Sequence, residues 1–170
     1  MKSVVKHLVF SIPYSSFILA SLLIHCVFLF TGNSLRLLYA NRKDIRIVRT
    51  SSKNPNETIV VDGLEDAIAV DFCFAEGFVF WTDVSLEKIK RIRVTGDTRK
   101  VEDVISAGLK KPEGLAVDWI AKKLYWTDCR DSDWERNRIE VANLDGTNRK
   151  VLFWKNLGLP RAIAVDPLKG

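Results

Sequence analysis

One short sequence recurs three times in this chain at a nearly fixed interval. Residues Ala67–Asp71 read AIAVD, Gly114–Asp118 read GLAVD, and Ala162–Asp166 read AIAVD again. The copies begin 47 and 48 residues apart. A period of roughly 40–50 residues is typical of β-propellers, in which each repeat is one blade. This interval therefore constrains the fold more than length or composition does.

A second element follows each of the first two copies. Phe78–Asp83 reads FVFWTD, and Lys123–Asp128, which begins 45 residues later, reads KLYWTD. A run of apolar residues before a polar stop predicts a strand that is buried on both faces. In the later repeat, Arg138–Val141 alternates in polarity, Leu144–Gly146 is suited to a hairpin turn, and Val151–Trp154 supplies a last strand.

Each period therefore predicts four short strands joined by turns. No amphipathic helix of ten or more residues is expected after the N-terminal segment. A single four-stranded unit with aromatic strands cannot bury both of its faces, so successive units must stack as the blades of a propeller. The alternative is a β-sandwich whose strands resemble one another by accident, which three ordered copies make a poor explanation. The predicted fold class is all-β.

The first 34 residues differ from the rest. Lys2 and Lys6 precede an apolar run from Leu8 to Phe30, and a small residue, Ser34, suits cleavage. This pattern predicts a secretory signal peptide over residues 1–34. The 23 residues of the apolar run could also span a bilayer of ~30 Å as an uncleaved signal anchor, so both interpretations stay open. Either one places the following residues in the lumen or outside the cell.

Composition beyond residue 34 excludes several function classes. The 26 basic residues of the chain include Lys2 and Lys6, so 24 basic and 21 acidic residues remain, for a net charge of +3. That nearly even balance of charges does not indicate a nucleic-acid-binding surface. Both histidines, His7 and His25, lie in the predicted leader. The remainder therefore offers neither a Ser-His-Asp triad, nor a Cys-His dyad, nor a histidine-ligated zinc site.

Two cysteines and one glycosylation sequon remain. Cys73 and Cys129 are too few for a disulfide framework, and they either pair or stay as thiols, with a buried thiol favoured for Cys73 between two phenylalanines. Asn56 begins the sequon Asn-Glu-Thr in a polar stretch, which predicts a glycosylated surface loop.

The chain resembles a known family at these motifs. Phe80–Asp83 and Tyr125–Asp128 are similar to the signature of the six-bladed YWTD propellers of the LDL-receptor class. Five further strings resemble the N-terminal propeller of the LDL-receptor-related proteins that serve as Wnt co-receptors: Leu37–Arg42, Gly63–Ala67, Asn137–Val141, Arg149–Trp154 and Pro160–Ala164. The resemblance covers residues 35–170.

The resemblance implies a partial six-bladed propeller of about three blades. The expected blades are residues 35–61, with fewer than four strands, then 66–105 and 114–154, and the start of a fourth at 162–166. Six blades of about 45 residues need about 270 residues, so this part corresponds to about half a ring. A half ring would expose apolar faces and unpaired strand edges, and we expect residues 35–170 to aggregate when expressed alone.

The resemblance also implies a function. Loops before each Ala-Val-Asp strand and after each Thr-Asp would open on one face that takes secreted protein ligands, namely a Wnt or a Wnt antagonist, at the surface of the cell or in the secreted state. No cofactor, metal, nucleic acid or catalytic residue is expected, and the membrane would be reached only through parts beyond this sequence or an uncleaved leader. The expected ligand-binding residues are Arg42, Glu65, Asp66, Val84, Ser85, Glu87, Lys110, Lys111 and Arg161.

Two alternative functions stay open at this point. One is an endocytic receptor of the LDL-receptor class, and the other is a propeller hydrolase with a metal held by carboxylates. The obvious catalytic candidates recur in every period, whereas a catalytic group is needed only once. We therefore assign structural roles to Thr82, Asp83, Thr127 and Asp128, and to Asp71, Asp118 and Asp166.

Two features of this sequence differ from the pattern that the resemblance implies. Lys110 and Lys111 stand where uncharged residues are expected, which would weaken attraction for basic ligands. The loop 129–136 is longer than the pattern and contains Trp134, which would serve either as a binding anchor or as cover for a neighbouring loop.

Overall fold

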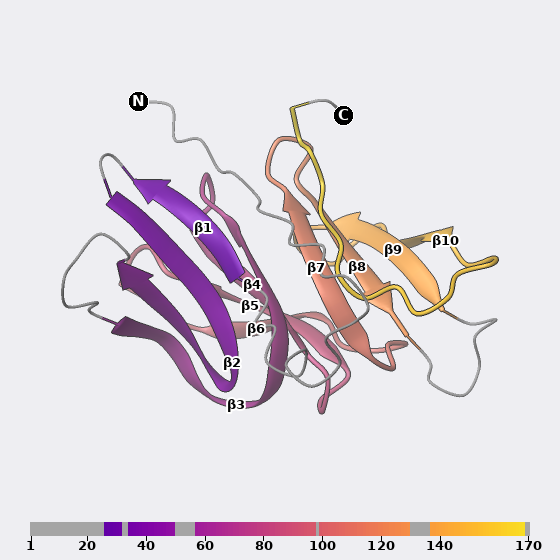
Figure 1. Cartoon of the computed structure of the whole chain (residues 1–170), viewed down its shortest axis with the longest axis horizontal. Helices are drawn as coiled ribbons and strands as arrows, with labels where there is room; N and C mark the ends of the chain where they lie inside the picture. The colour runs from indigo at the N-terminus through magenta and orange to yellow at the C-terminus, as the bar shows by residue number, and fades with distance from the viewer. Residues whose placement is uncertain (1–25, 32–33, 50–56, 98, 130–136, 169–170) are drawn as a thin grey trace, which may run out of the picture.

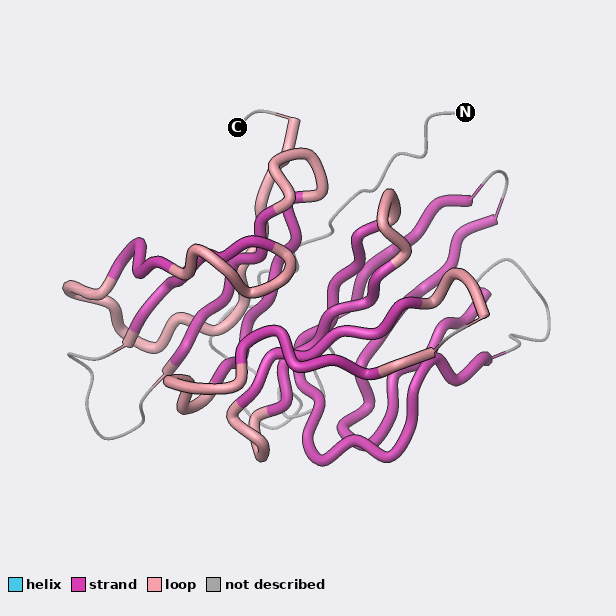
Figure 2. Tube along the Cα trace, turned by 180° about the vertical axis from the view of Figure 1, so that it is seen from behind, coloured by secondary structure: helices cyan, strands magenta, loops and turns pink. Residues whose placement is uncertain are grey.

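The computed structural model describes residues 26–31, 34–49, 57–97, 99–129 and 137–168. These residues form ten strands and no helix, which confirms the predicted all-β fold (Figures 1 and 2). Among them there is accordingly no helix that is long and apolar enough to cross a membrane. The strands are β1 Cys26–Thr31, β2 Ser34–Arg49, β3 Glu57–Cys73, β4 Phe78–Asp83, β5 Lys88–Arg93, β6 Val101–Ile105, β7 Pro112–Asp118, β8 Lys123–Asp128, β9 Arg138–Asn143 and β10 Lys150–Phe153.

The strands pair only with neighbours and in antiparallel fashion. Sheet order is β1-β2-β3-β4-β5-β6 in one sheet and β10-β9-β8-β7 in the other. The six-stranded sheet contains two blades because its long strands bend (Figure 1). β2 doubles back near Arg42, which has a φ of 53°, and β3 bends near Gly63, which has a φ of 68°.

Pairing registers locate the blade boundaries. The first part of β2 pairs with β1, its second part pairs with residues 57–62 of β3, and residues 67–73 of β3 pair with β4. We call β1, β2 and residues 57–62 blade I. Residues 67–73 with β4, β5 and β6 form blade II, and β7 to β10 form blade III. Each blade thus has four antiparallel segments.

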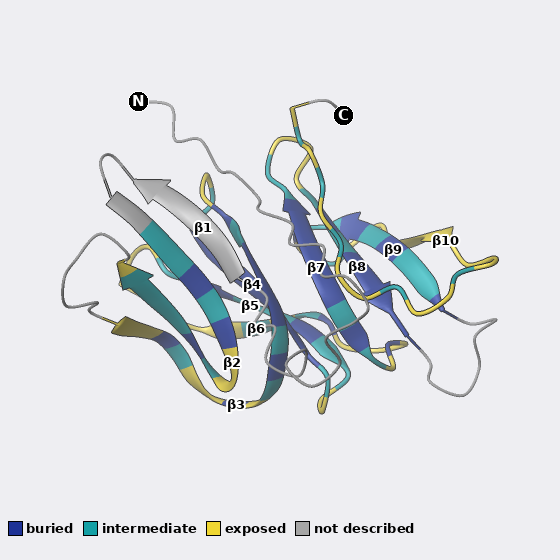
Figure 3. Ribbon diagram, viewed as in Figure 1, coloured by how far each residue is buried: buried dark blue, intermediate teal, exposed yellow. Residues whose placement is uncertain are grey.

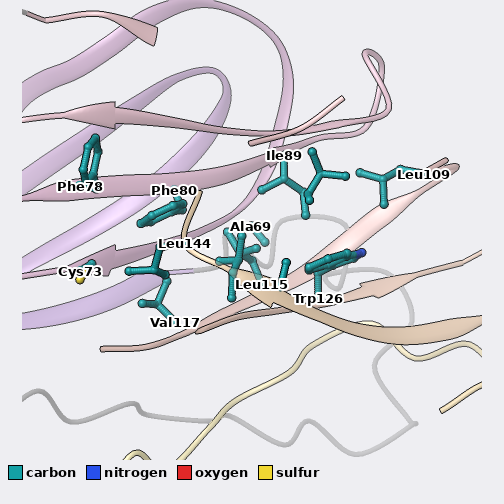
Figure 4. Packing of buried hydrophobic residues seen from close by; sticks show 13 residues of the cluster. Ala69, Cys73, Phe78, Phe80, Ile89, Leu109, Leu115, Val117, Trp126 and Leu144 are labelled. Carbon is teal, nitrogen blue, oxygen red and sulfur yellow. The ribbon is translucent and has the colours of Figure 1, made fainter. Parts of the chain in front are cut away.

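Two hydrophobic clusters fill the spaces between blades. Leu38, Ile45, Val79 and Trp81 belong to the cluster between blades I and II. The larger cluster joins blades II and III, where Trp126 is fully buried (Figure 4). Blade II contributes to both clusters, and all six residues of β4 are buried, as the continuous apolar run predicts.

Turn chemistry confirms the hairpin expected at Leu144–Gly146. Gly146 has a φ of 85°, and its amide donates to the carbonyl of Asn143 over 2.9 Å. A side chain at Gly146 would collide with the carbonyl oxygen of Val104 in blade II. Glycine is required here for its conformation and for the close approach of two blades.

Two parts of the chain differ from expectation. β1 lies inside the predicted leader, 1–34, and it supplies a strand to a first blade that was expected to have fewer than four. Ala162–Asp166 was expected to be the first strand of a further blade, but the structure assigns no strand within residues 154–168. Side chains of Thr127 and Cys129 donate hydrogen bonds to the carbonyls of Arg161 and Pro160, but none of the described strands pairs with this segment.

Candidate binding face

The loops that carry the predicted ligand-binding residues meet at one end of the strands. Asp83, at the end of β4, is fully buried, and its carboxylate accepts hydrogen bonds from the backbone amides of Glu65, Asp66 and Leu86 over 3.1–3.2 Å. The amide of Val84 donates to the carbonyl of Asp66 over 3.0 Å. One buried carboxylate therefore fixes two loops of blade II side by side.

Blade III repeats this arrangement. Asp128, also fully buried, accepts hydrogen bonds from the amides of Lys110 and Lys111 over 2.8 Å each. Arg138 lies 3.3 Å from the other oxygen of the same carboxylate. The Asp of each Trp-Thr-Asp motif therefore organises the loops of the face, which supports the structural role assigned to it.

The threonine that precedes each of these aspartates forms hydrogen bonds with backbone groups near the start of an inner strand. The hydroxyl of Thr82 accepts a hydrogen bond from the amide of Ala69 over 3.1 Å, and that of Thr127 accepts one from the amide of Gly114 over 2.9 Å. Thr127 also donates to the carbonyl of Arg161 over 2.7 Å. These contacts fix where each inner strand begins.

Exposed charges on the face pair across the blade junctions. Arg42 of blade I lies 2.8 Å from Asp66 of blade II, and Lys110 of blade III lies 2.7 Å from Glu87 of blade II. The guanidinium of Arg161 lies 3.5 Å from a carboxylate oxygen of Glu113. We call this face, with its nine predicted residues, the binding face.

The remaining predicted residues join the same face. Glu65 lies 3.4 Å from Lys43, which also donates to the Glu65 carbonyl over 2.8 Å. Lys111 lies 3.5 Å from Glu113. Ser85 is exposed in the turn after β4. All nine predicted residues thus lie at one end of the blades, on loops or at the bends of β2 and β3, and all seven charged ones face an opposite charge.

Lys43 and Glu113 belong to the binding face and were not predicted. Glu113 precedes the second Ala-Val-Asp copy just as Asp66 precedes the first and Arg161 the third, 47 and 48 residues apart. The repeat alone therefore could have identified it. Lys43 has no counterpart in the other repeats.

Both cysteines are free and buried. Burial, with the nearby carboxylates of Glu113 and Asp128, raises the pKa of Cys129 to about 11. Burial also raises the pKa of Cys73. The thiol of Cys129 donates to the carbonyl of Pro160 over 2.9 Å. The thiol alternative for these residues therefore holds in this structure.

The predicted glycosylation site, Asn56, and the loop residue Trp134 lie outside the described residues. Within the described residues, no group of three or more His, Cys, Asp or Glu side chains could hold a metal ion.

Comparison with known proteins identifies the family. Residues 77–119 and 122–167 match the low-density lipoprotein receptor repeat class B. The chain is 51% identical over 146 residues to low-density lipoprotein receptor-related protein 5 of Mus musculus, and 56% identical over 134 residues to the protein of that name in Homo sapiens. These alignments cover 86% and 79% of this chain but 9% and 8% of the relatives, so the chain spans less than a tenth of their length.

A solved structure supports the same assignment. The chain superposes on a chain of a nidogen/laminin complex with a TM-score of 0.69 and 31% sequence identity, covering 79% of this chain and 50% of that one. The two receptor-related relatives belong to a non-enzymatic family with these repeats, and this chain is accordingly not an enzyme. The partial YWTD propeller expected from the sequence is therefore confirmed, and the chain belongs to the low-density lipoprotein receptor class B repeat family.

Proposed function

We propose that this chain is the extracellular ligand-binding part of a Wnt co-receptor-like LDL-receptor-related protein, and that the binding face recognises a secreted protein, a Wnt or a Wnt antagonist. The observation that carries the proposal is the gathering of the nine predicted residues on one face, where loops of successive blades present exposed charges. The similarity to low-density lipoprotein receptor-related protein 5 supports it.

Exposed ion pairs on this face can exchange partners. Arg42 and Arg161 each keep 66% of their side-chain surface exposed, and Glu87 keeps 43%. Exposed pairs contribute little to stability, so their groups are available to a ligand at low cost. A ligand segment can therefore replace these pairs with charge-assisted hydrogen bonds to the guanidinium and carboxylate groups.

The test is direct binding to the whole chain secreted from animal cells and captured on a sensor surface. Saturable binding of a purified Wnt or Wnt antagonist is expected, and Glu87→Ala and Arg161→Ala should each weaken it at least fivefold. Glu76→Ala is the matched control, because Glu76 pairs with Lys122 over 3.0 Å in turns at the opposite end of the strands. Unchanged binding in both binding-face variants would disprove the site.

We also propose that the chain enters the secretory pathway and carries a glycan at Asn56. The sequon and the basic-apolar N-terminal segment support this route. Secretion of the chain, with a shift in electrophoretic mobility that Asn56→Gln abolishes, is the expected result. Retention of the unglycosylated chain in the cytosol would contradict it.

A further inference from the structure

The net positive charge of the chain beyond residue 34 is concentrated in one hairpin. Residues 88–103, which include β5 and β6, contain six basic and three acidic residues. Their net charge of +3 equals that of residues 35–170 as a whole, so the remainder of that range is balanced. β5 reads KIKRIR, and short runs rich in lysine and arginine are typical of surfaces that bind heparin or nucleic acid. We call residues 88–103 the basic hairpin.

The charges at the two ends of the basic hairpin differ in their contacts. At the start of β5, the ammonium groups of Lys88 and Lys90 lie 2.6 Å and 2.5 Å from the two carboxylate oxygens of Asp103. Lys88 pairs with Asp83, so this end of the hairpin is the one near the binding face. Its two lysines already share an acidic partner, and they therefore offer little to an anionic ligand.

The other end of the hairpin presents basic groups without acidic partners. Arg93, Arg99 and Lys100 are exposed, and none of them forms an ion pair with any residue that the structure describes. Arg93 pairs with Phe78, the first residue of β4, so this end lies opposite to the binding face. Arg99 donates to the carbonyl of Val60 over 3.4 Å. β6, which follows Lys100, alternates between exposed and partly buried residues before its buried last residue (Figure 3).

An aromatic ring supports the free guanidinium of Arg93. The guanidinium carbons of Arg93 and Arg91 lie 4.5 Å and 4.4 Å from the centroid of the Phe78 ring. Arg91 is fixed by Glu102, 2.8 Å from its Nε, and by the carbonyl of Leu144, which accepts a hydrogen bond over 2.9 Å. Stacking on the ring leaves the N–H groups of Arg93 available, and a guanidinium can bind two oxygens of one anion.

The same contacts favour one class of polyanion. Phe78 is only 8% exposed and lies beneath two guanidinium groups, so it offers no surface on which a nucleic-acid base could stack. Arg99 reaches the side of blade I at Val60, whereas Arg91 reaches the side of blade III at Leu144. Basic groups therefore lie on both sides of the hairpin end. A flexible chain with repeated anionic groups can contact both sides, which a single small anion cannot.

We propose that Arg93, Arg99 and Lys100 bind a sulfated glycosaminoglycan, with Arg91 as a positioning residue. Asp97, exposed in the same loop, leaves this end of the hairpin with a positive balance of two charges. Sulfated glycosaminoglycans are polyanions of the cell surface and its matrix, where a receptor of this family would meet them. The site is separate from the binding face, and it shares with the proposed function only the extracellular location.

The first test titrates the whole secreted chain with a heparin fragment in solution, by calorimetry at 0.15 M salt. Saturable binding is expected, and Arg93→Ser should weaken it at least threefold. Lys88→Ser is the matched control, because it removes the same charge from the same strand where Asp103 is already the partner. It should change the dissociation constant by less than 1.5-fold. Failure of the unmodified chain to bind, or equal weakening in both variants, would overturn the site.

Comparison of polyanions tests the class of ligand. Desulfated heparin, single-stranded DNA and polyglutamate should each bind at least tenfold more weakly than heparin. Heparin binding should itself weaken as salt is raised from 0.05 to 0.5 M, because the contacts are between charges. Equal affinity for polyglutamate would point to an acidic peptide as the ligand, and equal affinity for DNA would show binding to any polyanion. Either result would overturn the proposal.

Lysine labelling of the unmodified protein decides the question even if a variant fails to fold. Heparin should slow reductive methylation of Lys100 at least threefold, as followed by mass spectrometry. Lys150 and Lys155, which are exposed at β10 and just after it, should react at the same rate with and without heparin. Equal protection of all three lysines, or of none, would show that heparin does not bind at this end of the hairpin.

Discussion

At the scale of single residues, the repeated threonine is a structural group whose role can be measured. The Thr82 hydroxyl is fully buried and accepts the Ala69 amide proton. Thr82→Val keeps the shape but leaves that buried donor unpaired, so we expect the free energy of unfolding to fall by about 1–3 kcal/mol in urea titrations. Val151→Thr, at an exposed position of β10, is the control and should change it by less than about 0.5 kcal/mol. Equal effects would contradict a specific role for Thr82.

Lys110 should weaken the attraction of the binding face for basic ligands. Its ammonium group lies 2.7 Å from Glu87, and both side chains are about half exposed. Lys110→Ser leaves the Glu87 carboxylate free for a basic ligand segment, and we expect two- to threefold tighter binding, since exposed pairs contribute roughly 0.2–1 kcal/mol. The gain should shrink as salt is raised from 0.05 to 0.5 M, by titration on a sensor surface. Tighter binding that is independent of salt would refute the electrostatic explanation.

Cys129 should be inert at ordinary pH. Its raised pKa, about 11, means that at pH 8 the thiolate is about a hundredfold rarer than in an unfolded chain with a pKa of 9.0. Iodoacetamide should modify the native protein much more slowly than the urea-unfolded protein, as followed by mass spectrometry. Because the unfolded thiol loses its proton first, the free energy of unfolding should fall as pH rises from about 9 to about 11. Rapid native labelling at Cys129 would contradict this assignment.

At the scale of elements, the cues that repeat in the sequence predicted blades II and III. Both contain an Ala-Val-Asp strand followed by an aromatic strand, and their alternating and continuous apolar runs give the burial that the structure shows. Blade I has neither cue. Its inner strand comes from Cys26–Thr31, where an apolar run suits a secretory leader and a strand equally well. Periodicity cannot distinguish the two.

The sequence repeat predicted only one side of the hydrogen bond that joins blades II and III. Asp71 is 2% exposed, and its carboxylate accepts the amide proton of Val117 in the next blade over 2.6 Å. The repeat marks Asp71 as structural, but only the stacking of blades reveals its partner. Asp118, in the matching position of blade III, accepts amide protons from its own turn, at Ile120 and Ala121.

These two aspartates allow a matched experiment. Asp71→Ala removes an acceptor between blades II and III, so we expect the free energy of unfolding to fall by roughly 2–3 kcal/mol. Asp118→Ala removes only exposed turn contacts and should cost about 1 kcal/mol or less. Chemical denaturation followed by tryptophan fluorescence measures both. A larger loss from Asp118→Ala would contradict the inter-blade role of Asp71.

At the scale of the whole molecule, the binding face shows what a repeat can and cannot predict. Positions before the Ala-Val-Asp strands recur in sequence, so the loops that hold Asp66 and Arg161 could be assigned to one face. The partners of these charges lie on other blades, and their distances depend on how closely the blades stack. The pairs of Arg42 with Asp66 and of Glu87 with Lys110 therefore required the structure.

Stacking also predicts how stability is distributed over the molecule. β4 has a paired strand on each side, lies in the blade that contributes to both hydrophobic clusters, and is buried throughout. β10 pairs on one side only, and all four of its residues are exposed. Amide exchange reports the free energy of local opening, which rises with burial and with paired neighbours. Amides of Phe78–Asp83 should therefore exchange at least a thousandfold more slowly than those of Lys150–Phe153, as measured by mass spectrometry.

Trp81→Ala, which empties the cluster between blades I and II, should accelerate exchange in β4 far more than it does in β10. Uniform exchange rates across the two strands would mean that the three blades open as a single unit, and that blade II is not the most stable part of the stack.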